Sequence, residues 1–110
     1  MKSINLIQNT IEIEIEKIRP QEEIRAELDF TFTFENNILV IFEIRPSFMD
    51  KTIIFSRPIA KTRYYNSKEI WKIYWMRAND NWELYETSEV KTIVEFFEIV
   101  EEDEYGCFFG

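Results

Sequence analysis

One stretch, residues 57–86 (RPIAKTRYYNSKEIWKIYWMRANDNWELYE), constrains the fold of this chain more than any other. It holds all three tryptophans and four of the five tyrosines, and its side chains alternate with the period of two that a β-strand gives. Asn and Asp at positions 79–81 tolerate the backbone conformations of tight turns. The pattern predicts consecutive antiparallel strands. Their apolar face is predicted to carry Trp71, Ile73 and Trp75, with Trp82 also assigned to the core.

Two further strands are expected before this stretch. Apolar and polar residues alternate from Leu28 to Glu35, which is typical of a half-buried strand. After a turn at Asn36-Asn37, residues 38–45 form a nearly continuous apolar run, as in a central strand. In this second strand we expect Phe42 and Ile44 to face inward. Its charged residues, Glu43 and Arg45, are then expected to face outward, beside Lys61 and Arg63 of the next strand.

Proline residues mark where strands end or are disturbed. Pro46 is predicted to end its strand because it cannot donate a hydrogen bond to a neighbour. A short loop at 47–52 and a short strand at 53–55 follow. Pro58 is predicted to mark a bulge, or an unpaired position, before a long central strand.

The two ends of the chain are predicted to be helical. In residues 3–18 the isoleucines fit helical spacing, but Ile11, Ile13 and Ile15 also alternate with glutamates as in a strand. We predict a helix, which Pro20 ends before a short second helix. A last helix is expected to begin after a cap at Thr87 or Ser88 and to fray in the acidic run 101–104. The tail 107–109 is expected to fold back onto the core.

These elements predict a single α+β domain over residues 1–110, with an N-terminal helix in residues 1–19. Between the helices we expect an antiparallel meander of four or five strands. Both helices should pack on the tryptophan-bearing face of the sheet, since that face offers the apolar surface that a helix must cover. The other face of the sheet is then left open for a partner.

Five short segments occur in a particular order: FEIRP (42–46), PIAKTRYY (58–65), IWKIYWMR (70–77), NWELYE (81–86) and GCFFG (106–110). Together they resemble the domain-of-unknown-function family numbered 3024, from roughly Pro20 to the end of the chain. The resemblance implies a strand ending in Arg45-Pro46 and an Arg63-Tyr64 pair in the next strand. The sequence departs from the family at Thr62, where an aromatic residue is more usual. The resemblance implies a fold and a boundary, and no chemistry.

The charge of the chain is unevenly distributed. Residues 1–44 carry 4 basic and 9 acidic groups, residues 45–77 carry 8 and 2, and residues 78–110 carry 1 and 10, which gives a net charge of −8. Acidic helices near basic strands would offset this charge within one molecule. Alternatively, a basic sheet face is offered to an anionic partner. We favour the first interpretation, because runs of charge are usually solvated faces.

Composition argues against several classes of site. Histidine is absent, which removes the commonest general base and metal ligand. Both glycines lie in the last five residues, so no phosphate-binding loop is expected, and we predict no cofactor and no metal. The single cysteine, Cys107, is interpreted as a small core residue. No apolar run is long enough to cross a membrane and no signal peptide is recognisable, so we expect a cytoplasmic protein without a membrane partner.

The remaining candidates are predicted to lie on the outer sheet face. The proposed binding residues are Glu43, Arg45, Lys61, Arg63, Lys72 and Tyr74. The leading hypothesis is a non-catalytic adaptor that holds an acidic protein segment. The alternative is single-stranded nucleic-acid binding by the same face, with Tyr65 as a stacking residue, which the net charge disfavours. A third, weaker hypothesis is a carboxylate-dependent enzyme centred on Glu43. The sequence indicates no oligomeric state.

Overall fold

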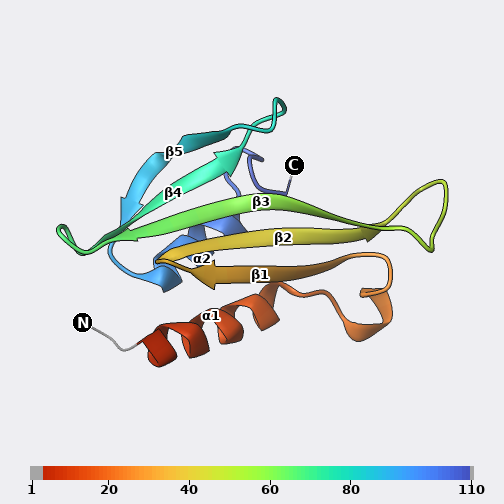
Figure 1. Cartoon of the computed structure of the whole chain (residues 1–110), viewed down its shortest axis with the longest axis horizontal. Helices are drawn as coiled ribbons and strands as arrows, with labels where there is room; N and C mark the ends of the chain where they lie inside the picture. Colours follow the sequence, from red (N-terminus) through yellow and green to blue (C-terminus); the bar gives the residue numbers. More distant parts are fainter. Residues whose placement is uncertain (1–3, 110) are drawn as a thin grey trace.

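A computed structural model describes residues 4–109. The elements are, in order, α1 (Ile4–Ile18), the 3-10 helix η1 (Glu22–Ile24), β1 (Asp29–Glu35), β2 (Ile38–Pro46), β3 (Ile54–Tyr65), β4 (Ile70–Met76), β5 (Trp82–Val90) and α2 (Ile93–Glu102). The strands form one antiparallel sheet in the order β1-β2-β3-β4-β5 (Figure 1). The predicted α+β class, the meander and both terminal helices are confirmed. The predicted helix start at Ser3 and the closing Gly110 lie outside the described residues.

The meander follows from turns that the sequence encodes. Asn36 and Asn37 have φ values of 53° and 64°, and Glu35 pairs directly with Ile38. Two central residues with positive φ make the tight hairpin whose twist matches that of the flanking strands. Asp80 has a φ of 63° in the turn between β4 and β5. Both predicted turns are confirmed.

The helices cover one face of the sheet. α2 passes behind the strands in Figure 1 and α1 runs beside β1. Ile11 and Ile15 of α1 are buried in the same core as Phe96 and Phe97 of α2 and Trp71 of β4. This one-sided burial explains why residues 4–18 form a helix although their sequence also alternates. None of the helices within residues 4–109 is long and apolar enough to cross a membrane.

The boundary between β5 and α2 differs from the prediction. The helix cap is Thr92 and not Thr87 or Ser88: its side chain accepts a hydrogen bond from the backbone N–H of Glu95, whose side chain in turn accepts from the backbone N–H of Thr92. This capping box satisfies N–H groups that the helix itself cannot. β5 therefore continues to Val90, after an irregularity in its pairing with β4.

β3 is one strand of 12 residues and not the two pieces predicted. The predicted bulge at Pro58 is confirmed, because the β2–β3 register shifts between Ile41 and Phe42, where Phe42 lies opposite Pro58. The residue that departs from the family pattern, Thr62, is fully buried, and its hydroxyl donates to the backbone carbonyl of Lys72 at 2.8 Å.

The C-terminal tail folds back onto the core, as predicted. Asp103 ends α2 in a left-handed conformation with a φ of 43°. Its carboxylate accepts hydrogen bonds from the backbone N–H groups of Phe108 and Phe109, each at 2.9 Å. Phe108 is buried against Tyr85, with ring centroids 4.9 Å apart. One aspartate thus stops the helix and fixes the tail.

Candidate functional site

The sheet face away from the helices gathers basic and aromatic side chains from β3, β4 and β5. Lys61 and Arg63 lie two residues apart in β3, and the register places Tyr74 opposite Lys61 and Lys72 opposite Arg63. Directly paired residues point to the same side of an antiparallel sheet, so these four predicted site residues share one face. We term the cluster the basic aromatic face; it comprises Lys61, Arg63, Tyr65, Lys72, Tyr74 and Trp82.

The cations of this face lie over aromatic rings. The Lys61 Nζ atom lies 4.7 Å from the ring centroid of Tyr74 and 5.2 Å from that of Trp82. The Arg63 Cζ and Lys72 Nζ atoms each lie 5.1 Å from the ring centroid of Tyr65. Within about 6 Å, the negative face of a ring attracts a cation electrostatically. Each of the three cations therefore lies against a ring that attracts it without neutralising its charge.

No carboxylate within the described part of the chain forms an ion pair with these three cations. Glu89 lies opposite Lys72 in the register, but the Lys72 ammonium lies over the Tyr65 ring. Several arginines elsewhere do form ion pairs; Arg19, for example, meets Asp29 at 2.8 Å. The basic aromatic face thus carries three cations without ion pairs to described carboxylates, on a chain whose net charge is −8.

Two tyrosines connect the cations. The hydroxyl oxygens of Tyr65 and Tyr74 lie 3.3 Å apart. Burial, together with the hydrogen bond to Tyr65, raises the pKa of Tyr74 to about 12. The same hydrogen bond lowers the pKa of Tyr65, helped by the positive charges of Arg63, Lys72 and Lys61. Burial also lowers the pKa of Lys61, and the charge of Arg63 adds to that effect. The face is therefore partly desolvated and electrostatically coupled.

The prediction that Glu43 and Arg45 lie on this face is wrong. Glu43 pairs in register with Phe30, whose side chain is buried in the core, so Glu43 points to the helix-covered side. Arg45, two residues further along β2, points to the same side. Phe42 and Ile44, predicted to face inward, take the opposite side. The apolar run of β2 shows no alternation that could fix the faces. At its inward positions the Glu43 side chain is 16% exposed and the Arg45 side chain is 56% exposed. A charged pair is tolerated there because its Glu43 Oε1 and Arg45 Nε atoms meet at 2.6 Å.

The assignment of Trp82 to the core is also wrong. Trp82 pairs with Met76, on the side of Tyr74 and Leu84, and it is half-buried. Tyr85, only 5% exposed, occupies the core position of β5 instead. The spacing of Trp82 and Tyr85 could have indicated this. Residues three positions apart in a strand point to opposite faces, so the two aromatic side chains cannot both face the core.

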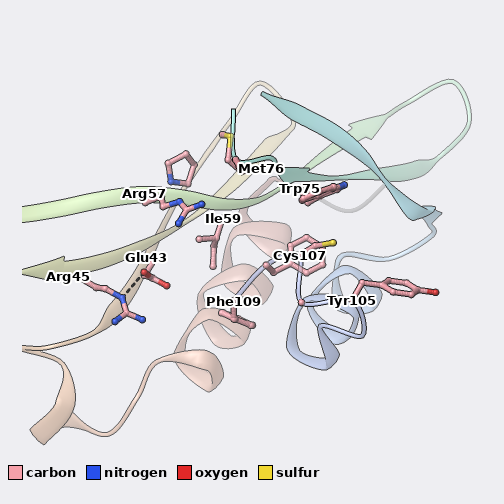
Figure 2. A pocket seen from close by; sticks show the side chains of 13 residues that line it. Glu43, Arg45, Arg57, Ile59, Trp75, Met76, Tyr105, Cys107 and Phe109 are labelled. Carbon is pink, nitrogen blue, oxygen red and sulfur yellow. Dashed lines mark hydrogen bonds and ion pairs between the residues drawn. The ribbon is translucent and has the colours of Figure 1, made fainter. Parts of the chain in front are cut away.

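On the helix-covered side, a hollow of about 470 Å³ opens between the β2–β3 hairpin and the C-terminal tail (Figure 2). Arg57, which the sequence analysis did not select, projects into it near the Glu43–Arg45 pair. Cys107 also lines the hollow. Burial and the negative charges of Asp103 and Glu83 raise the pKa of the Cys107 thiol, which keeps it in its poorly nucleophilic protonated form. In the same hollow, the Glu43 carboxylate is engaged by the Arg45 guanidinium.

Within residues 4–109, no three His, Cys, Asp or Glu side chains are grouped so that they could hold a metal ion. Comparisons with curated proteins and with solved structures found no match. A family model described as "Domain of unknown function (DUF3024)" matches residues 2–110. The chain therefore belongs to the DUF3024 family, as the order of its short motifs indicated.

Proposed function

We propose that this protein is a non-catalytic binding domain that holds an acidic protein segment on its basic aromatic face. The observation that carries the proposal is the set of three cations, Lys61, Arg63 and Lys72, which contact aromatic rings and no described carboxylate. A carboxylate-bearing partner would supply the missing counter-charges. Lys61 and Lys72 are half-buried, so charge pairs formed there are less screened than pairs on an open surface.

The neighbouring strand suggests what else the partner carries. The outer face of β2 carries a half-buried apolar strip, formed by Ile38, Val40, Phe42 and Ile44. Val40 lies directly opposite Lys61. A bound segment would therefore meet positive charge on β3 and β4 and apolar surface on β2. This favours an acidic segment that also contains apolar residues. We place the interaction in the cytoplasm, where a free thiol such as Cys107 is expected.

The geometry favours a protein segment over single-stranded nucleic acid. Bases bind such sheets by stacking on exposed aromatic rings. Here Lys61 lies over the ring of Tyr74, and Arg63 and Lys72 lie over that of Tyr65. A base would have to displace these cations. The net charge of −8 would also repel a phosphate backbone at long range.

The proposal is tested by charge reversal with a matched control. The Lys61→Glu/Arg63→Glu variant and a control, Arg57→Glu/Lys68→Glu, each change four units of charge, but the control leaves the basic aromatic face intact. Both are used as bait in pull-downs alongside the wild type, with protein and nucleic acid read together. We expect a partner with an acidic segment that the wild type and the control retain and that the Lys61→Glu/Arg63→Glu variant binds about tenfold or more weakly.

Added salt should weaken this interaction, because its cations are partly exposed. The proposal is wrong if every recovered partner binds both variants equally. Recovery of nuclease-sensitive nucleic acid, lost only in the Lys61→Glu/Arg63→Glu variant, would instead support the nucleic-acid alternative. The enzymatic hypothesis has its own test, since a folded Glu43→Gln variant should then lose any activity found by substrate screening.

A further inference from the structure

The β2–β3 hairpin extends beyond the other strands (Figure 1). β1 pairs with β2 only as far as Ile44, and β4 pairs with β3 only from Ala60 onward. Past these points the two strands pair only with each other, Arg45 with Phe55 and Pro46 with Ile54. We term residues 45–57 the arm. One side of its β3 strand, where β4 would continue, is an open sheet edge.

The hydrogen bonds of the arm show which groups face this open edge. The backbone N–H of Ser47 donates to the carbonyl of Ile53 at 2.7 Å. Because backbone groups alternate in direction along an antiparallel strand, Phe55 and Arg57 also turn their N–H and C=O groups toward β2. Ile54 and Ser56 then turn theirs toward the open edge. Within residues 4–109 no strand pairs with them there.

The arm is also the most exposed apolar part of the described chain. Phe48 is 99% exposed and Met49 is 90% exposed, and Ile54 and Phe55 of the strand itself are 58% and 59% exposed. The tip is nevertheless ordered by its own hydrogen bonds, since the Ser47 hydroxyl oxygen accepts from the backbone N–H of Met49 at 3.2 Å. Natural proteins usually protect an open edge with charges, prolines or a cover. Residues 52–56 (TIIFS) contain no charge and no proline.

We propose that the arm pairs with the arm of a second copy of this chain, edge to edge and antiparallel. The edge is self-complementary, because Ile54 and Ser56 each offer one donor and one acceptor. A two-fold axis at Phe55 places Ile54 of one copy opposite Ser56 of the other, and the two Phe55 side chains opposite each other. An isologous dimer requires this kind of self-matching patch.

Charge favours a second copy at this edge. Two chains of net charge −8 repel each other, so they can approach most easily through the arm, where residues 52–56 carry no charge and Asp50 is the one acidic residue beside Arg45, Lys51 and Arg57. In an antiparallel pair of arms, the two acidic bodies also lie at opposite ends. The register brings Thr52 of one copy opposite Pro58 of the other. Phe48 and Met49 then extend toward the hollow that Pro58 and Met76 line.

The first experiment measures the mass of the full chain by sedimentation equilibrium from about 1 µM to about 1 mM, the range expected for a small interface. We expect the wild type to approach twice the 13.4 kDa of one chain. Ser56→Pro removes an N–H from the open edge and leaves the bonds to β2 in place. It should weaken the dimer at least about tenfold, whereas the matched Ser56→Ala variant, which keeps the N–H, should not.

The second experiment tests the register, in a Cys107→Ala background that removes the native thiol. Directly opposed residues in a non-hydrogen-bonded antiparallel pair lie close enough for a disulfide. Phe55→Cys should therefore cross-link two copies under mild oxidation. Arg57→Cys should not, because its counterpart would lie four residues along the partner strand.

Three results would overturn the inference. The wild type could remain at 13.4 kDa throughout the concentration range, Ser56→Pro could dimerise as strongly as Ser56→Ala, or Arg57→Cys could cross-link as readily as Phe55→Cys. Circular dichroism and thermal unfolding of each variant show that a lost dimer is not lost folding. These measurements do not involve Lys61 or Arg63, so they decide this inference independently of the proposed function.

Discussion

The two faces of the sheet are built from the same strands but depend on different interactions. On the helix-covered face, Ile73 is fully buried in the same core as Phe96 and Phe97 of α2. On the basic aromatic face, no helix of the described chain covers Lys72 and Tyr74, which alternate with Ile73 in β4. Strand periodicity allows one sequence to specify both surfaces at once.

This difference shows which face the fold depends on. Burying a large apolar side chain contributes about 1.5–3 kcal/mol, and the covered face holds many such side chains. A partly exposed cation–π contact contributes about 0.5–1 kcal/mol, and burying a lysine costs part of that. We therefore expect the basic aromatic face to contribute less to folding than the covered face does, which leaves its charges available to the partner that we propose.

The largest expected effect comes from the covered face. Phe97→Ala leaves a cavity in a fully buried site, so we expect the free energy of unfolding to fall by about 3–5 kcal/mol. Leu84→Ala, on the outer face where Leu84 is 46% exposed, should cost less than about 1 kcal/mol. Urea denaturation followed by tryptophan fluorescence measures both.

A loss of this size approaches the whole stability of a small domain. If Phe97→Ala is unfolded, the milder Phe97→Leu variant should still lose more stability than Leu84→Ala. Equal losses at Phe97 and Leu84 would mean that the two faces do not differ as described, and that the outer face is structural.

Local signals in the sequence were enough for most of the fold. The Asn36-Asn37 turn, the alternation in β4 and the helical spacing of α2 each depend on near neighbours, and all were predicted. The cap at Thr92 was missed although Thr92 and Glu95 have the spacing of a capping box. Thr87 and Ser88 follow the stretch 57–86 directly and are therefore the caps that the sequence predicts. The irregular pairing that extends β5 to Val90 depends on β4 and has no local signal.

The sheet face of each candidate residue was predictable where alternation is clear, and the prediction was wrong where it is not. Lys61, Arg63, Lys72 and Tyr74 lie in strands whose polar and apolar residues alternate, and they share one face. Glu43 and Arg45 follow the uniformly apolar part of β2, where only pairing with β1 fixes the direction of each side chain. The open edge of the arm depends on where β4 stops, which alternation cannot show.

The next effect concerns the tyrosine pair of the basic aromatic face. The pKa of Tyr74 is raised from 10.0 to about 12. Above pH 10 the unfolded chain releases a proton that folded Tyr74 keeps, so this contribution to stability is complete below pH 10 and is lost as the pH rises through 12. In Tyr65→Phe, the hydrogen bond and charge of Tyr65 disappear and burial remains, so the pKa of Tyr74 should lie between these two values.

Residue-resolved NMR of the tyrosine ring carbons during a pH titration measures this change. Tyr105→Phe is the matched control, because it removes a hydroxyl that does not contact Tyr74 and should leave the pKa near 12. An unchanged Tyr74 pKa in Tyr65→Phe would show that burial alone raises it. The ionisation of Tyr74 would then not depend on Tyr65, although their hydroxyl oxygens lie within hydrogen-bonding distance.

The smallest expected effect distinguishes the faces most sharply. Lys61→Met keeps the length and apolar stem of the side chain but removes its charge. The loss of two cation–π contacts destabilises the fold, whereas removal of a buried ammonium stabilises it. These terms oppose each other, and we expect the free energy of unfolding to change by less than about 0.5 kcal/mol. Lys68→Met, in the exposed turn after β3, provides the control in the same urea titration.

If Lys61→Met is neutral for stability, selection for folding cannot explain why a lysine is half-buried between Tyr74 and Trp82 when methionine would serve as well. A loss above about 1 kcal/mol would mean that the cation–π contacts stabilise the sheet itself. The outer face would then stabilise the fold as the covered face does, and the charge of Lys61 would contribute to that stability. If Lys61→Met leaves the free energy of unfolding unchanged but abolishes capture of an acidic partner, the charge of Lys61 serves binding. One residue would then affect recognition without affecting stability.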